Sequence, residues 1–199
     1  MTGISRRDLL KTAGLAGMAI TAIPHFSRVL SYRRELFAQT RSLNTAELAT
    51  LTAICSRLIP TDDNGPGAVE AGAPNYIDRA LSGWLAPSRP DYTSGLATID
   101  STSQQKFNKA FTALSAQQQD AVLGDVEEIP FFALVRAHTL QGTFGDPIYG
   151  GNANFVGWHL IGYPGVRMNV SAAEQNMSTP AARNHKSAYD YLMFSKPAM

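Results

Sequence analysis

The sequence predicts an all-α fold, arranged as a single helical domain. Three observations support this class: apolar residues recur at intervals of three and four, helix-start signals precede several of these runs, and no alternating, strand-like run exceeds a few residues. The chain has 199 residues, of which 44% are hydrophobic and 17% charged. It is therefore long enough for one ordinary core and too apolar to be a disordered tail.

The first helix is expected over residues 45–59. Asn44 is a favourable N-cap and Glu47 follows three positions later, the pattern of a capping box. Pro60 ends the helix, and the Asp, Asn and Gly residues of 61–67 indicate a turn. These residues lack the ligand spacing and the closing Glu of a calcium loop. The apolar stripe of the helix comprises Leu48, Leu51, Cys55, Leu58 and Ile59.

A second helix is expected over residues 74–85, because proline is tolerated in a first turn and apolar residues follow on one side. Residues 91–102 are polar and contain Gly95, which predicts a connection with at most a short helical turn. The apolar side of the second helix comprises Tyr76, Ile77, Ala80, Leu81 and Trp84.

Three more helices are expected before residue 142. Phe107, Phe111 and Leu114 predict one over 104–114. Ser115 and Gln118 form a second capping box that restarts the chain as a helix to about residue 127. The last runs over 131–141 and places His138 on its apolar stripe, which favours a satisfied core histidine over a ligand or a base.

Periodicity then disappears over residues 142–165, a long irregular segment that holds seven of the 16 glycines. Long structureless segments are uncommon in compact domains, and a mixture of Gly, Asn and aromatic residues suits a docking surface. The alternative is that its aromatic residues cover the chain's own helices. The polar tail 168–199 either packs or forms an arm. The aromatic candidates for a partner interface are Phe144, Tyr149, Phe155, Trp158 and Tyr163.

The N-terminus carries a twin-arginine export motif, followed by a weakly apolar run over 12–23. The run is too short to span a bilayer, which needs about 20 apolar residues. Residues 1–31 are therefore interpreted as signal and leader, with cleavage after Ala22, after Ser31 or not at all. The helical domain is expected over 42–199, and the twin-arginine translocase is an expected partner. The motif comprises Ser5, Arg6, Arg7, Leu9, Leu10 and Lys11.

Charge is balanced overall but not along the chain. The sequence contains 17 Lys and Arg and 16 Asp and Glu, and the resulting net charge of +1 argues against a nucleic-acid binder. Residues 1–41 hold seven basic and two acidic residues, whereas residues 42–199 hold ten and fourteen. Residues 1–41 are thus +5 and residues 42–199 are −4, which separates the N-terminal segment with its export signal from the domain that follows.

Signals for chemistry within the chain are weak. There is no phosphate-binding glycine loop and no nucleophile elbow, and the four histidines lack zinc-site spacing. An enzyme would need a site assembled from distant residues such as Asp146 and His159. Cys55 is the one cysteine, so it is either buried or a candidate for an interchain disulfide. We expect no catalytic, cofactor-binding or metal-binding residue in this chain.

Three blocks together resemble the gluconate 2-dehydrogenase subunit 3 family. They are the export motif, residues 59–78 from Ile59 to Asp78, and residues 131–165, where G-T-F-G-D-P-I-Y-G-G-N is followed by G-W-H-L-I-G-Y-P-G. The third block is the most specific. The resemblance covers residues 5 to about 167 and leaves the tail unassigned.

The resemblance implies a non-catalytic small, or gamma, subunit of a membrane-associated sugar or polyol dehydrogenase in the periplasm. In such complexes a large subunit binds FAD, a multihaem cytochrome subunit carries haem c, and the small subunit provides export and stability. The flavoprotein would then leave the cytoplasm bound to this chain. The alternative is a stand-alone periplasmic binding module that uses the aromatic segment 142–165. Which sugar, polyol or acid is oxidised would be decided in another chain.

Overall fold

The computed structural model describes residues 41–175 and 182–191. Within these ranges the chain forms six α-helices and several short 3-10 helices, and no strand. The β pairing there is one isolated bridge between Asp62 and Gly65. The all-α prediction is therefore confirmed for the described residues. The twin-arginine motif and the leader 1–31 lie outside them.

Helix α3 (Thr45–Leu58) begins as the sequence predicts. The Asn44 side chain accepts a hydrogen bond from the Glu47 amide at 2.9 Å, and the Glu47 carboxylate accepts one from the Asn44 amide at 2.9 Å. This reciprocal pair satisfies two amides that a helix start otherwise leaves without partners. Thr50, Leu51, Ile54 and Cys55 form its buried face.

Helix α4 (Ala73–Leu81) packs most extensively against α7 (Pro130–Phe144). A buried carboxylate in α4 also fastens the start of the domain. Asp78 is 3% exposed, and its Oδ1 accepts hydrogen bonds from the amides of Ser42 and Leu43, both at 2.8 Å. Because both contacts are to backbone, the residues just before α3 are fixed whatever their side chains.

The prediction that residues 91–102 form a connection is wrong. Helix α5 runs from Arg89 to Phe107 and includes all of them. Its outer face is rich in Ser and Thr, whose hydroxyls bond back to carbonyls of the same helix, as Thr98 does to Ser94. These side chains are exposed and leave a narrow buried stripe on the other face: Tyr92, Gly95, Leu96, Ile99 and Ser103.

Gly95 is a packing residue, not a helix break. A Cβ atom at this position would lie 2.0 Å from the ring of Phe131, so glycine is what lets α5 approach α7 so closely. The separate helix expected over 104–114 is also wrong. Helix α5 ends at Phe107 and is capped by Asn108, which adopts the left-handed conformation with φ of 52°. Phe111 then begins the short 3-10 helix η3 (Phe111–Ala113).

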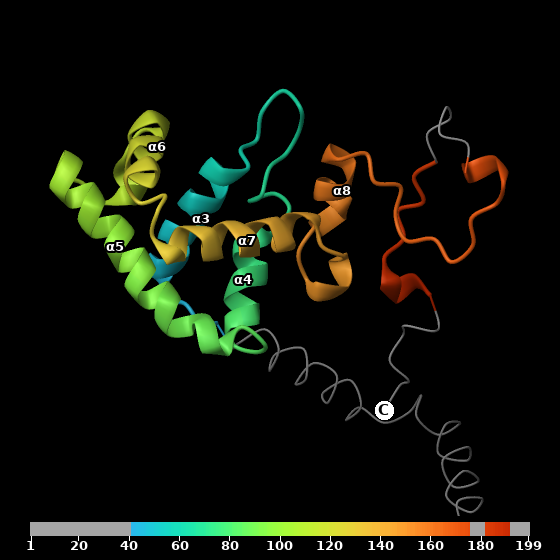
Figure 1. Cartoon of the computed structure of the whole chain (residues 1–199), viewed down its shortest axis with the longest axis horizontal. Coiled ribbons are helices and arrows are strands. Elements are labelled where there is room, and N and C mark those ends of the chain that lie inside the picture. Colours follow the sequence, from blue (N-terminus) through green and yellow to red (C-terminus); the bar gives the residue numbers. More distant parts are fainter. Residues whose placement is uncertain (1–40, 176–181, 192–199) are drawn as a thin grey trace, which may run out of the picture. The chain divides into compact units, whose positions relative to one another are not determined.

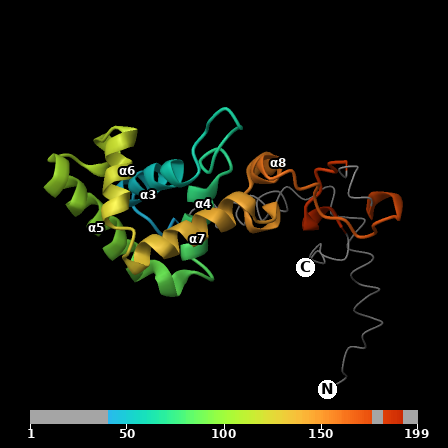
Figure 2. The ribbon, with the colours of Figure 1, turned by 45° about the horizontal axis from the view of Figure 1, so that its top comes forward.

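Helix α6 (Ala116–Asp125) starts at the predicted second capping box. The Gln118 amide donates to the Ser115 hydroxyl at 3.3 Å, and the Ser115 amide donates to the Gln118 side chain at 3.1 Å. Helices α5 and α6 gather beside one end of α7, and the short α8 (Val156–Leu160) lies beyond its other end (Figures 1 and 2).

The segment 142–165 is irregular only in part. Helix α7 extends through Phe144, and the 3-10 turns η4 (Pro147–Tyr149) and η5 (Ala153–Phe155) lead into α8. Beyond it the described tail holds two further 3-10 turns, η6 (Ala173–Gln175) and η7 (Ala188–Asp190). The absence of helical periodicity is thus explained by turns too short to show one.

Candidate partner interface

Trp158 was a candidate for partner contact, but the structure places it inside the chain. It is 5% exposed, and its indole N–H donates to the Phe144 carbonyl at 2.9 Å. Its ring packs edge-on against Tyr163 at a centroid distance of 4.8 Å and lies 5.5 Å from the ring of Phe155. Trp158 therefore attaches α8 to the end of α7, which was the alternative that the sequence left open.

Asn152 organises the same segment and was not singled out from the sequence. It is fully buried with φ of 46°, a left-handed conformation that Asn tolerates better than most residues. Its side chain donates to the Gly145 carbonyl at 2.9 Å and accepts from the Gly157 amide at 2.8 Å. The sequence signal for this role is Asn152 itself, at the end of the Tyr-Gly-Gly-Asn run 149–152. The side-chain amide of a buried asparagine in a loop commonly replaces missing hydrogen-bond partners of the backbone.

Gly157 marks the close contact between α8 and α7. A Cβ atom here would lie 1.9 Å from the Thr143 carbonyl oxygen, so any larger residue would push α8 away from α7. Together with Trp158 and Asn152, this contact determines where the segment after α7 turns back on the domain.

Two large aromatic residues remain on the surface and flank a hollow. Trp84 is 60% exposed and Tyr149 is 63% exposed. The ring of Tyr76 lies 6.0 Å from that of Trp84. These side chains border a cavity of about 440 Å³, which is lined by Tyr76 of α4, by Trp84 from the turn after α4 and by the C-terminal end of α7. We call its lining residues the aromatic patch: Tyr76, Trp84, Gln141, Gly145 and Tyr149.

Trp84 was expected on the buried side of a helix reaching residue 85, and that expectation is wrong. Helix α4 ends at Leu81, and Ser82 and Gly83 close a turn on the carbonyls of Arg79 and Ala80. The chain leaves the helical path there, and Trp84 moves from the core face to the surface. The signal that the sequence offered was Ser82-Gly83 directly before it.

Side-chain contacts hold Tyr149 in its position on the patch. The Asp146 carboxylate accepts from the Ile148 amide at 2.8 Å, which starts η4. Arg79 of α4 donates to the Gly150 carbonyl and so ties the end of η4 to α4. The patch is therefore formed by elements that are fixed to each other before any partner binds.

The described part of the tail packs and is not a free arm. The Asn184 amide donates to the Pro164 carbonyl at 2.8 Å, and the Val166 amide donates to the Lys186 carbonyl at 3.1 Å. The Ala188 amide reaches the Asp146 carboxylate at 3.0 Å. Residues 182–191 thus return to the loop after α8 and to the residue that begins η4.

A sequence model of the family described as gluconate 2-dehydrogenase subunit 3 matches residues 45–165. The chain belongs to this family. The match begins at the first residue of α3 and ends at Gly165, so it includes the helices, the aromatic patch and α8. The family is a small subunit of a dehydrogenase complex. No curated protein and no solved structure matches the chain.

Asp146 and His159, the pair that an enzyme would need, have separate partners in this subunit 3 chain. The Asp146 carboxylate accepts two backbone amides, whereas His159 Nε2 lies 2.8 Å from His185 Nε2. Desolvation, followed by the charges of Arg183 and His185, lowers the pKa of His159. The two imidazoles link α8 to the tail.

The other titratable candidates of the subunit 3 chain lie in its core. Cys55 is fully buried beside the Thr139 hydroxyl at 3.4 Å, and burial raises the pKa of its thiol to about 12. The thiol would have to leave the core before it could meet another chain. His138 Nδ1 lies 3.0 Å from the Tyr92 hydroxyl, and burial lowers the pKa of His138.

The described residues of this family member contain no group of three or more His, Cys, Asp or Glu side chains arranged to hold a metal ion. None of the helices in the described ranges has the length and apolar character needed to cross a bilayer.

Proposed function

We propose that this chain is the non-catalytic small subunit of a periplasmic, membrane-associated, FAD-dependent sugar or sugar-acid dehydrogenase. In this proposal it escorts the folded flavoprotein subunit through the twin-arginine pathway and stabilises it. The observation that carries the proposal is the match of the subunit 3 family model to residues 45–165. The twin-arginine motif at Arg6 and Arg7, in front of that domain, supports the export role.

The redox groups belong to other chains in this proposal. FAD resides in the large subunit, and haem c resides in a multihaem cytochrome subunit that passes electrons to the membrane. No residue of this chain is assigned to either group. A cofactor that must be inserted before export explains why a folded-protein route is used, because the flavoprotein would cross the membrane with FAD already bound.

The aromatic patch is our candidate for the flavoprotein contact. Trp and Tyr are enriched at interfaces and supply most of the binding free energy where they fill or border a pocket. Trp84 and Tyr149 are both more than half exposed beside a cavity of about 440 Å³. A protruding apolar side chain of the large subunit would fill that cavity and cover both rings.

The export role is tested by replacing Arg6 and Arg7 with Lys together. We expect the flavoprotein to stay in the cytoplasm, which fractionation and dehydrogenase activity in each compartment would measure. Normal export of the flavoprotein in this double variant would contradict the escort role and leave membership of the complex intact.

Membership of the complex is tested by purifying the C-terminally tagged chain in mild detergent and recording its visible spectrum and subunit composition. We expect flavin absorption with a large co-eluting chain, and haem bands if the cytochrome is retained. A colourless single chain would contradict the proposal and favour the stand-alone binding module.

A further inference from the structure

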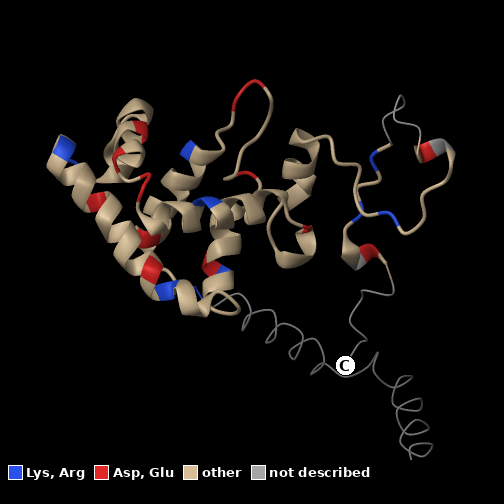
Figure 3. Ribbon diagram, viewed as in Figure 1, with Lys and Arg blue, Asp and Glu red and all other residues tan. Residues whose placement is uncertain are grey.

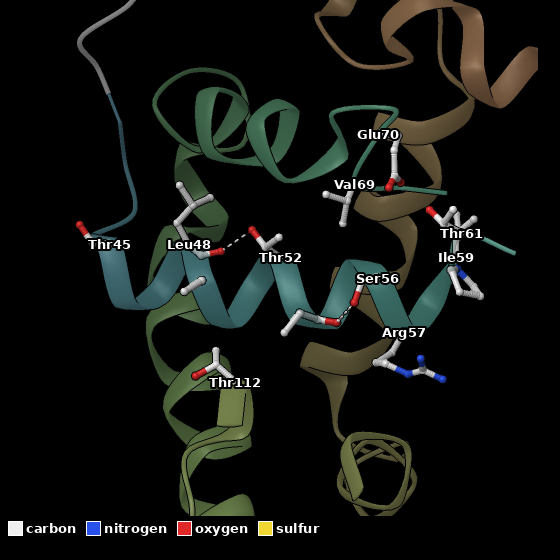
Figure 4. A pocket seen from close by; sticks show the side chains of 13 residues that line it. Thr45, Leu48, Thr52, Ser56, Arg57, Ile59, Thr61, Val69, Glu70 and Thr112 are labelled. Atoms are coloured by element: carbon white, nitrogen blue, oxygen red, sulfur yellow. Dashed lines mark hydrogen bonds between the residues drawn. The ribbon is translucent and has the colours of Figure 1, made fainter. Parts of the chain in front are cut away.

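A long groove follows the outer face of α3 and shares no residue with the aromatic patch. Its volume is about 830 Å³. Figure 4 shows α3 along the groove, with Val69 and Glu70 on one side of the helix and Thr112 on the other. Helix α3 has 14 residues, so its length is about 21 Å at 1.5 Å per residue, or roughly four turns.

The floor of the groove consists of two helical rows in which every side chain except Leu48 is small. Residues four apart lie on one ridge of a helix, and small residues there let a second helix approach closely. Ala49 is exposed, and Ala53 is half-buried. The rows are Thr45, Ala49 and Ala53, and Leu48, Thr52 and Ser56.

Two of the three hydroxyl groups in these rows, those of Thr52 and Ser56, already donate to carbonyls of α3. Thr52 donates to the Leu48 carbonyl at 2.7 Å, and Ser56 donates to the Ala53 carbonyl at 2.9 Å (Figure 4). Donors that bond to their own helix are not available to a polar ligand. The floor therefore suits an apolar or small-residue surface better than a sugar, which needs several hydrogen bonds.

At one end of the groove the lining includes Glu70 and also Arg57, whose charge is paired with Asp120 at 2.7 Å, and the adjoining loop is acidic. The loop between α3 and α4 contains Asp62, Asp63 and Glu70 and no Lys or Arg, and Figure 3 shows this loop with red segments and no blue. None of the ion pairs within the described ranges involves these three carboxylates. A hydrogen bond from Thr61, with further bonds from the amides of Glu70 and Gly67, lowers the pKa of Glu70.

We call the three carboxylates Asp62, Asp63 and Glu70 the acidic rim, and the loop that carries them is held against α3. The Ala68 amide donates to the Ile59 carbonyl at 2.9 Å, and the Gly67 amide donates to the Glu70 carboxylate at 3.1 Å. Asp62 and Gly65 close the tip of the loop through their paired backbone groups. The groove and its negative end are therefore formed in the free chain, so binding would require little ordering.

We infer that this groove receives an α-helix of the large subunit, which lays small or apolar side chains on α3 and directs a Lys or Arg toward Asp63 and Glu70. The inference rests on the proposed function, because it takes the large subunit as the partner. An amphipathic helix in an apolar groove is a recurrent mode of recognition, and the acidic rim would determine its direction. The groove would then be a second contact, separate from the aromatic patch.

The test fills the groove and compares the result with the same substitution elsewhere on α3. Ala49→Trp places a large ring on the floor, whereas Ala46→Trp adds the same ring at an exposed position of α3 that does not line the groove. The full chain is co-expressed with the large subunit, and dissociation of the purified complex is measured on dilution. We expect at least tenfold faster dissociation for Ala49→Trp and less than twofold for Ala46→Trp.

The charge of the rim is tested in the same assay. Asp63→Lys reverses one charge of the loop whose Thr61 and Glu70 line the groove, and Glu127→Lys makes the same change at an exposed site after α6, in a turn that contributes no lining residue. We expect Asp63→Lys to slow association with the large subunit severalfold at low salt, and we expect this slowing to disappear at high salt. Glu127→Lys should leave the association rate unchanged at both salt concentrations. Equal association rates for the two variants would overturn both the direction assigned to the partner helix and the Lys or Arg that it is proposed to place at the acidic rim.

Two outcomes separate this inference from the proposed function. If the wild-type chain retains no flavoprotein, both fail. If the complex forms and Ala49→Trp dissociates like Ala46→Trp, with both free chains melting as wild type does, the groove inference alone fails. A photo-crosslinking residue at Ala49 identifies the occupant. Attachment to a large-subunit helix supports the inference, and attachment to another part of this chain or to a second copy overturns it.

Discussion

The helical body, residues 43–144, and the C-terminal segment, residues 145–175 and 182–191, are stabilised by different interactions. The buried apolar cluster of the described chain extends from Leu43 to Val135 and so lies wholly in the body. The C-terminal segment is held instead by polar contacts and by the aromatic packing of Trp158, and its backbone carries strain. Four of the five non-glycine residues with positive φ in the described ranges lie there: Asn152, Asn154, Phe155 and His185.

This difference predicts a hierarchy of stability. The body buries large apolar side chains in a shared core, and such burial contributes roughly 25 cal/mol per Å². The segment is attached to it by a few contacts, among them those of Trp158 to Phe144, of the Asn152 amide to the Gly142 carbonyl and of Arg79 to the Gly150 carbonyl. Regions with few apolar contacts open at lower free energies than the core. We therefore expect the segment to open while the body remains folded.

The largest effect on stability should come from a substitution in the core, which should unfold the body and the C-terminal segment together. Phe111 is fully buried in the apolar cluster of the body. Phe111→Ala should cost about 3–5 kcal/mol, a large part of the 5–15 kcal/mol typical of a whole domain. Urea denaturation followed by circular dichroism would measure it. Loss of the segment alone in this variant would contradict the hierarchy.

Trp158→Ala should sharpen the contrast, because it removes the main contact between the segment and α7. We expect amides of residues 145–175 and 182–191 to lose hydrogen-exchange protection by tenfold or more, while those of α3, α4 and α5 keep theirs. Ile161→Ala, at a side chain 59% exposed in the same segment, is the matched control. Uniform loss of protection in both regions would show that they unfold as one unit.

Trp84→Ala should separate binding from stability. Because the side chain is 60% exposed, we expect little change in melting temperature. Its loss should weaken the complex with the large subunit by about 2 kcal/mol, as is usual for a central aromatic contact. Tyr163→Ala removes a partly exposed aromatic residue outside the patch and should change affinity less. Equal losses of affinity in Trp84→Ala and Tyr163→Ala would contradict a specific role of the aromatic patch in binding.

The smallest effect should be a pH dependence that differs between the regions. The pKa of His138 and of His159 is lower in the folded chain, whereas an unfolded histidine titrates near 6.5. Below about pH 6.5 the unfolded state binds more protons, so stability should fall as pH falls and stay constant above about pH 7.5. Denaturation from pH 8 to pH 5 would measure this.

His138→Phe isolates the contribution of the body to that pH dependence. It should flatten the dependence of global unfolding, while hydrogen exchange in the C-terminal segment still responds through His159. If global stability depends on pH as strongly in this variant as in the wild type, His138 has the same pKa in the folded and the unfolded state. Some loss of stability at all pH values is expected in this variant, because the Tyr92 hydroxyl loses its partner.

Local signals in the sequence predicted much of the body. Both capping boxes, at Asn44 and at Ser115, were readable because their partners lie three residues away. Helix α5 was missed because its buried stripe includes Gly95 and Ser103, so apolar periodicity is weak. That face is buried because α3, α6 and α7 pack against it, and no local pattern contains that information.

The candidate interface was harder to predict for a related reason. Residue type pointed to Trp158 and Tyr149 equally, but one is buried by Tyr163 and Phe144 while the other is exposed. Trp84 was placed in the core because the apolar spacing continued past the true end of α4. In each case exposure depends on where the chain turns, and that is decided by contacts distant in sequence.

The close approach of α5 and α7 has a consequence for relatives of this chain. Because a Cβ atom at Gly95 would collide with the Phe131 ring, the two positions share one fixed volume. A lineage that acquires a side chain at position 95 should carry a smaller one at position 131, and the exchange should pass through an unstable single variant. Evolution at these two sites is therefore expected to be correlated, and the pair would help to align distant members of the family.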